Sequence, residues 1–177
     1  MSKENEIQFS TENLPFLLHY ERYSLGWDSC HEGFFIDPQG NVYSYEKPYY
    51  WNSFISPARN DATVFWGYET DGQISPQKLF ENLKKLKKQN SDLGPIALYL
   101  GHIELNMDEV FADLAKSEID EFGAGCDMGV KSFAVLIFDK TVDLYKRIIL
   151  KTSGDISCEN LSNFTPDLIN FFDFKVV

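Results

Sequence analysis

The chain has 177 residues, of which 44% are hydrophobic and 15% aromatic, and 16 basic against 27 acidic residues give a net charge of −11. This size and composition fit one globular domain with a sizeable core and exclude a disordered chain. The negative charge disfavours binding to nucleic acid or an anionic membrane, because the average field repels polyanions, and it favours a basic partner protein or a cationic ligand.

The N-terminal residues 1–11 are polar and lack the apolar segment of a secretory signal. We therefore expect a disordered segment over residues 1–11, followed by a single domain over residues 12–177. The longest apolar runs are far too short to cross a bilayer. Three cysteines without a short pairing, Cys30, Cys126 and Cys158, are typical of reduced thiols. Together these features predict a cytoplasmic protein that does not enter a membrane.

The first predicted elements are strands. Residues 16–23 form an apolar and aromatic run, and residues 33–37 and 42–46 are predicted to pair as a hairpin. Between them, Asp37-Pro38-Gln39-Gly40 places Asp, Pro and Gly at the first, second and fourth positions of a type I turn, with Gly40 suited to the positive φ of a bulge. Residues 47–62 carry two prolines and no regular period, which predicts a long loop.

Three helices are predicted from their N-terminal signals. These signals are Ser75 before Pro76, Asn106 three residues before Glu109, and Thr165 before Pro166. The first helix is expected to run through Leu86 with lysines near its C-terminal end, and the second to form an acidic helix over residues 108–121. Two further strands are predicted over residues 132–138 and 142–150, and residues 63–68 and 96–100 are candidates for additional strands. This order predicts an α+β fold, with an antiparallel or mixed sheet of about five strands and three helices packed mainly on one face.

The segment from Asp28 to Glu32 holds the pair of residues best suited to catalysis, Cys30 and His31. A cysteine nucleophile needs a base, but neighbours on an extended strand point to opposite faces. A remote histidine, His19 or His102, could replace His31, although nothing in the sequence brings either one near. No catalytic residue is therefore predicted, and Cys30 and His31 are the only candidates.

Metal and phosphate sites are not predicted either. The cysteines and histidines lack the short spacings of structural zinc sites, and the turn at residues 37–41 lacks the later Glu ligand of a calcium loop. The glycine-rich segment Gly123–Gly129 follows a predicted helix and precedes a strand, which is the reverse of the order in phosphate-binding loops. The sequence predicts no cofactor and no metal.

Two groups of residues are candidates for binding. The aromatic group crowds one strand and the loop after it: Tyr43, Tyr45, Tyr49, Tyr50 and Trp51. The acidic group belongs to residues 101–129, which hold eight acidic residues and one basic: Asp113, Glu118, Asp120 and Glu121. Tyr and Trp are common interface anchors, yet a loop that folds back over the sheet would bury the same rings. The sequence leaves these two interpretations of the aromatic group open.

The leading hypothesis is a non-catalytic protein-binding domain, of the inhibitor or immunity type, that engages a basic partner through the acidic helix and the aromatic loop. The alternative is a small enzyme or ligand-binding protein with a cleft near Cys30 and His31. A homo-oligomeric structural component is a third possibility, because the sequence does not fix the oligomeric state.

Overall fold

The computed structural model describes residues 9–24, 30–46, 73–89, 107–124, 129–154 and 156–173. Its strands are β1 (Phe16–Ser24), β2 (Cys30–Ile36), β3 (Val42–Glu46), β4 (Gln73–Ile74), β5 (Lys87–Gln89), β6 (Ile119–Ala124), β7 (Val130–Asp139), β8 (Leu144–Gly154) and β9 (Ile156–Asn160). Its helices are α2 (Pro76–Leu83), α4 (Met107–Lys116) and α5 (Thr165–Asp173).

The described strands form one nine-stranded sheet in the order β5-β3-β2-β1-β7-β8-β9-β6, with β4 beside β8. Every pairing in it is antiparallel. The prediction of about five strands was wrong. The additional strands β4, β5, β6 and β9 are only two to six residues long. Such short segments become strands because a neighbouring strand offers its backbone N–H and C=O groups, which a local pattern does not reveal.

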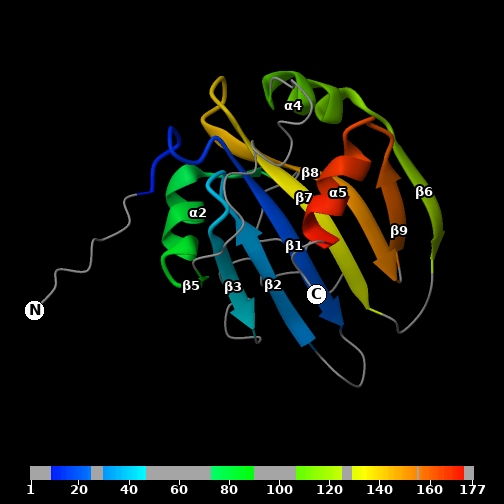
Figure 1. Ribbon diagram of the computed structural model, residues 1–177, viewed down its shortest axis with the longest axis horizontal. Coiled ribbons are helices and arrows are strands. Elements are labelled where there is room, and N and C mark those ends of the chain that lie inside the picture. Colours follow the sequence, from blue (N-terminus) through cyan, green and yellow to red (C-terminus); the bar gives the residue numbers. More distant parts are fainter. Residues whose placement is uncertain are drawn as a thin grey trace, which may run out of the picture.

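Helices cover both faces of this sheet, so the prediction that they pack mainly on one face was also wrong. Phe16 and Leu18 of β1 belong to a buried cluster with α4 and α5, whereas Leu17 between them belongs to a second cluster with α2. Figure 1 shows α5 lying across β7 and β8, with α2 at the opposite end of the sheet beside β3 and β5. Strands buried on both faces are apolar at almost every position, which explains the long apolar run of β7.

The β2–β3 hairpin confirms the predicted turn. The Gly40 N–H donates to the Asp37 carbonyl over 2.9 Å, and Gly40 has a φ of 87°. The Asp37 carboxylate accepts hydrogen bonds from the Gln39 and Asn41 N–H groups, the Asn41 side-chain amide and the Tyr43 hydroxyl. These local bonds fix the turn wherever the rest of the chain packs, so its sequence signal is reliable.

Helix α2 begins as predicted and ends earlier. The Ser75 hydroxyl accepts from the Lys78 N–H, and Pro76 is the first helical residue. The helix ends at Leu83, and Lys87–Gln89 then pairs with Val42–Ser44 as β5. Lys87 and Lys88, which the sequence predicts at the end of a helix, therefore lie on an edge strand. Charged edge strands are common in β-proteins because they discourage uncontrolled pairing.

The acidic helix was also predicted too long. Helix α4 ends at Lys116, and the Ser117 hydroxyl donates to the Asp113 carbonyl at its end. Residues 119–124 leave the helix because they pair with β9, starting at Ile119 opposite Asn160. The Asn160 side chain donates to the Leu114 carbonyl, which ties β9 to α4. The segment after β6 therefore connects two strands and does not follow a helix.

The start of the described chain is packed onto the fold. The Phe9 ring lies 5.7 Å from the ring of Tyr43 and 6.0 Å from that of Phe80. Of the predicted segment 1–11, residues 9–11 lie within the described structure and residues 1–8 lie outside it.

The β7–β8 hairpin ends in an ion pair. Lys146 Nζ lies 2.6 Å from Asp139 Oδ2, and both the N–H and the hydroxyl of Thr141 donate to Asp139 Oδ1. These partners stabilise the carboxylate form and hold the pKa of Asp139 well below its usual range.

Candidate functional site

The two catalytic candidates open strand β2. Cys30 pairs with Ser24, and His31 pairs with Tyr23. His19 pairs with Phe35, five residues further along β2 than Cys30, and at about 3.3 Å per residue this separation is roughly 16 Å. His19 is therefore too far along the sheet to act as a base for Cys30. His102, the other remote candidate, lies outside the described residues.

The aromatic candidates divide between the core and the part of the chain that is not described. Tyr43 and Tyr45 are 2% and 3% exposed, and both belong to the cluster that packs against α2. Burial and the Asp37 carboxylate, which accepts from the Tyr43 hydroxyl, raise the pKa of Tyr43 above its usual value of 10.0. Tyr49, Tyr50 and Trp51 lie outside the described residues, so only the two strand tyrosines can be assigned to the core.

A buried polar cluster that the sequence did not reveal occupies the same face. His19 and Glu21 are each 1% exposed, with 3.6 Å between His19 Nε2 and Glu21 Oε2. The same imidazole nitrogen lies 3.0 Å from the Tyr45 hydroxyl, and the imidazole ring stacks on Phe35 at a centroid distance of 4.1 Å. An imidazole, a carboxylate and a phenol can exchange protons, but their burial denies a substrate direct access. We assign this cluster to the core.

The cluster continues across the sheet toward β8. Ser132 pairs with Glu21 in the β1–β7 register, and Arg147 Nη2 donates to the Ser132 hydroxyl over 2.8 Å. One feature of the sequence points to this cluster: Leu17, His19 and Glu21 occupy alternate positions, which places all three on one face of β1. This alternation normally indicates a solvated face, and only the tertiary structure shows that the face is buried.

The acidic candidates gather where α4 passes into β6. Asp113 is partly buried, and its carboxylate accepts from the Ser162 hydroxyl over 2.5 Å, so it joins α4 to the segment before α5. Glu118 and Asp120 are exposed. Glu121 pairs with Cys158 in the β6–β9 ladder. The structure therefore gives Asp113 a packing role and places Glu118 and Asp120 facing solvent, close to where α4 ends and β6 begins.

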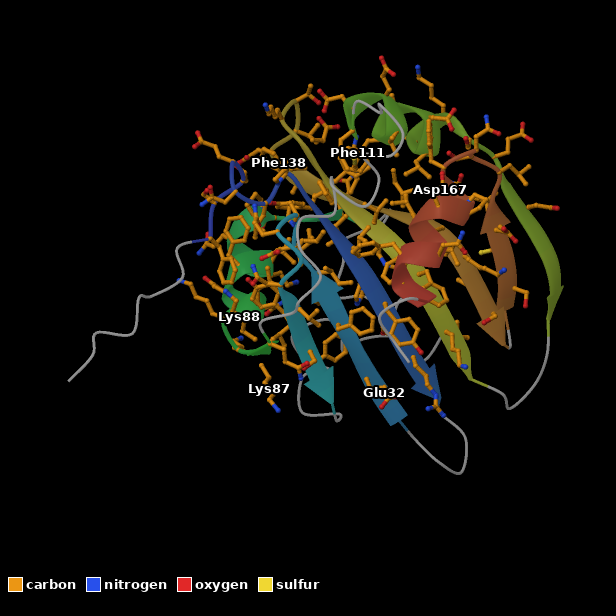
Figure 2. The ribbon with its side chains drawn as sticks, in the orientation of Figure 1. Glu32, Lys87, Lys88, Phe111, Phe138 and Asp167 are labelled. Atoms are coloured by element: carbon orange, nitrogen blue, oxygen red, sulfur yellow. The ribbon has the colours of Figure 1, made fainter. Side chains whose placement is uncertain are left out.

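Two aliphatic side chains are exposed within this acidic region. Ile119, between Glu118 and Asp120, is 45% exposed, and Leu161 is 58% exposed. The Leu161 N–H donates to the Glu118 carbonyl, so Leu161 lies opposite Glu118, whereas Ile119 pairs with Asn160 and its side chain points to the other face of the sheet. We call Glu118, Ile119, Asp120 and Leu161 the acidic edge. Figure 2 shows Lys87 and Lys88 of β5 at the opposite end of the sheet from β6, so these lysines are far from the carboxylates of the acidic edge.

A small pocket of about 200 Å³ lies beside the β2–β3 turn and is lined by Phe9, Asn13, Leu14, Asp37, Gln39, Asn41, Tyr43 and Lys88. The Asp37 carboxylate in its wall already accepts four hydrogen bonds from the turn and Tyr43. A carboxylate has about four acceptor positions, so Asp37 has no acceptor left for a ligand.

Within the described ranges, no group of three or more His, Cys, Asp or Glu side chains is arranged to hold a metal ion. No helix among the described residues is long and apolar enough to cross a membrane. Comparison with models of known protein families, with curated proteins and with solved structures found no match.

Proposed function

We propose that this chain is a non-catalytic protein-binding domain of the cytoplasm that engages a basic partner protein, as an inhibitor or immunity protein does. The observation that supports the proposal most is the acidic edge, where the exposed Glu118 and Asp120 share one face of the strand with the exposed Leu161, and Ile119 is exposed on the other face. Interfaces combine these two features, because charge speeds the encounter and apolar groups supply the area removed from water.

The four members of the acidic edge would divide this work. Glu118 and Asp120 are exposed, and exposed charges act mainly on the association rate and its salt dependence. Ile119 and Leu161 are 45% and 58% exposed, and burying this remaining surface in a complex would contribute about 1 kcal/mol each, roughly half of the value for a fully exposed aliphatic side chain. Asp113 would support the surface through Ser162 and would not touch the partner. In the sequence-based hypothesis, Tyr49, Tyr50 and Trp51 supply further anchors.

The test compares two variants with the same change in net charge. Glu118→Lys with Asp120→Lys reverses the acidic edge, and Glu12→Lys with Glu81→Lys reverses two exposed carboxylates elsewhere in the described fold. Basic proteins that co-purify with the wild-type chain are identified and then titrated with each variant by calorimetry, at low and at physiological salt.

We expect the edge variant to weaken binding by at least about tenfold, with a reduced salt dependence, and the control pair to change the affinity by less than about threefold. Equal losses in the two variants would mean that net charge alone attracts the partner. No loss in either one would exclude the acidic edge as the binding surface.

The alternative function, a cleft that uses Cys30 and His31, stays a prediction of the sequence. The register of β1 and β2 keeps His19 distant from Cys30 along the sheet.

A further inference from the structure

Strand β6 is the last strand of the described sheet. It pairs with β9 on one side, and among the described strands nothing pairs with its other side. Figure 1 places β6 at the margin of the molecule, beyond β9. An edge strand of this kind can accept a further strand, and its free N–H and C=O groups then supply the affinity.

The β6–β9 register shows which backbone groups face outward. The Leu161 N–H donates to the Glu118 carbonyl, and Ile119 pairs with Asn160. In an antiparallel ladder, hydrogen-bonded pairs alternate with pairs that are not hydrogen-bonded. The Asp120 backbone is therefore bonded to β9, whereas the N–H and C=O groups of Ile119 and Glu121 point away from it.

A row of charged side chains crosses β8, β9 and β6, and its last member is the Asp120 carboxylate. Lys151 of β8 pairs with Glu159 of β9, with 3.6 Å between Nζ and Oε2. Glu159 pairs in turn with Asp120, and within the described ranges no ion pair involves Asp120. Like charges directly opposite each other destabilise a sheet, and an opposite charge on the next strand would relieve this.

We propose that β6 accepts an extended segment of the basic partner as an added antiparallel strand, with a Lys or Arg side chain opposite Asp120. Outward bonds from Ile119 and Glu121 place Asp120 at a non-hydrogen-bonded position of the new ladder, where paired side chains come closest. The inference rests on the proposed function, because it specifies how the basic partner binds to the acidic edge.

The experiment uses two fluorescent peptides with the same number of lysines. One alternates Lys and Thr and can form a strand, and the other has Pro in place of Thr and cannot donate the ladder hydrogen bonds. Fluorescence anisotropy gives their affinities for the wild-type chain and for Ile119→Pro, which removes an outward N–H. Ile119→Ala is the matched control, because it truncates the same exposed side chain and keeps the N–H.

We expect the Lys-Thr peptide to bind the wild type at least about tenfold more tightly than the Lys-Pro peptide, from two or more backbone hydrogen bonds. Ile119→Pro should abolish that difference, and Ile119→Ala should retain it. Amide hydrogen exchange of the wild-type chain is a second measurement. Binding should newly protect the Ile119 and Glu121 amides, while the Asp120 amide is protected already.

Equal affinity for the two peptides, without new protection at Ile119 and Glu121, would overturn strand addition and leave the basic-partner proposal standing. Failure of both peptides to bind at low salt would overturn strand addition and the basic-partner proposal together. Stable self-association that Ile119→Pro abolishes would also overturn the inference, because the added strand would then come from a second copy of this chain.

Discussion

Gly33 is the residue of the sheet for which the expected effect of a substitution follows most directly from the structure. A Cβ atom on Gly33 would lie 2.5 Å from the Tyr45 hydroxyl and 2.7 Å from the adjoining ring carbon, and it would also clash with the backbone carbonyl of Tyr20. Carbon atoms in van der Waals contact normally stay about 3.5–4.0 Å apart. The Tyr45 ring would have to move by about 1 Å, and it is buried beside Phe35.

The expected magnitude combines three effects of Gly33→Ala. Overpacking costs about 1–3 kcal/mol. Displacing Tyr45 weakens its hydrogen bond to His19, which is worth about 1 kcal/mol. Alanine also lowers the conformational entropy of the unfolded chain, which offsets about 0.4–1 kcal/mol of this destabilisation. We therefore expect the free energy of unfolding to fall by about 2 kcal/mol, a decrease of about 1 M in the urea midpoint for a slope near 2 kcal/mol/M.

Urea unfolding followed by circular dichroism gives this value, and Tyr45→Phe serves as the partner variant. Without the hydroxyl, one of the close contacts disappears, so Gly33→Ala should destabilise the Tyr45→Phe chain by about 1 kcal/mol less than the wild type. If Gly33→Ala lowers the free energy of unfolding by less than about 0.5 kcal/mol, or if the two substitutions are additive, the close packing of Gly33 against Tyr45 is refuted.

Three further predictions concern other parts of the described fold. Phe172→Ala, at a side chain with no exposed surface in the α4–α5 cluster, should lower the free energy of unfolding by about 3–5 kcal/mol in urea titrations; a loss below about 1 kcal/mol would contradict that packing. Because the pKa of Asp139 is lower in the folded chain, the unfolded chain takes up this proton at a higher pH than the folded chain. The stabilisation from Asp139 is therefore complete above the ordinary pKa of 3.8, and it disappears as the pH falls through the folded pKa. In an NMR titration, Lys146→Met should raise the midpoint of the Asp139 carboxyl toward 3.8, and an unchanged midpoint would show that the ion pair is not its cause. Cys30 should react with iodoacetamide at neutral pH no faster than a model thiol, and a faster reaction would favour the enzymatic alternative.

Local chemistry explains the elements that were predicted correctly. The turn at residues 37–40 and the start of α2 depend on hydrogen bonds between residues a few positions apart, such as Ser75 with Lys78. Residues 16–23 and 132–138 were expected as strands from their apolar and β-branched side chains, and β1 and β7 contain them. These signals are independent of distant contacts, so the sequence is sufficient to find them.

The candidate site was only partly predictable. The sequence identified Glu118 and Asp120 as acidic binding residues, and the structure places both on the surface. It assigned them to a helix, because it contains no sign that Ile119 would pair with Asn160. It could not find Leu161, which is 41 positions from Asp120 in the chain and joins the acidic edge only through the β6–β9 pairing.

The sequence by itself determined the domain-sized, acidic chain, the β2–β3 turn, the helix starts and the core strands, because composition and local hydrogen bonding carry that information. The tertiary structure decided which short polar segments became strands, which helix covered which face, and that β6 and the lysine-bearing β5 lie at opposite ends of the sheet. Strand pairing and the choice of a face depend on contacts between residues far apart in the chain, and burial on both faces conceals the alternation that would otherwise indicate them.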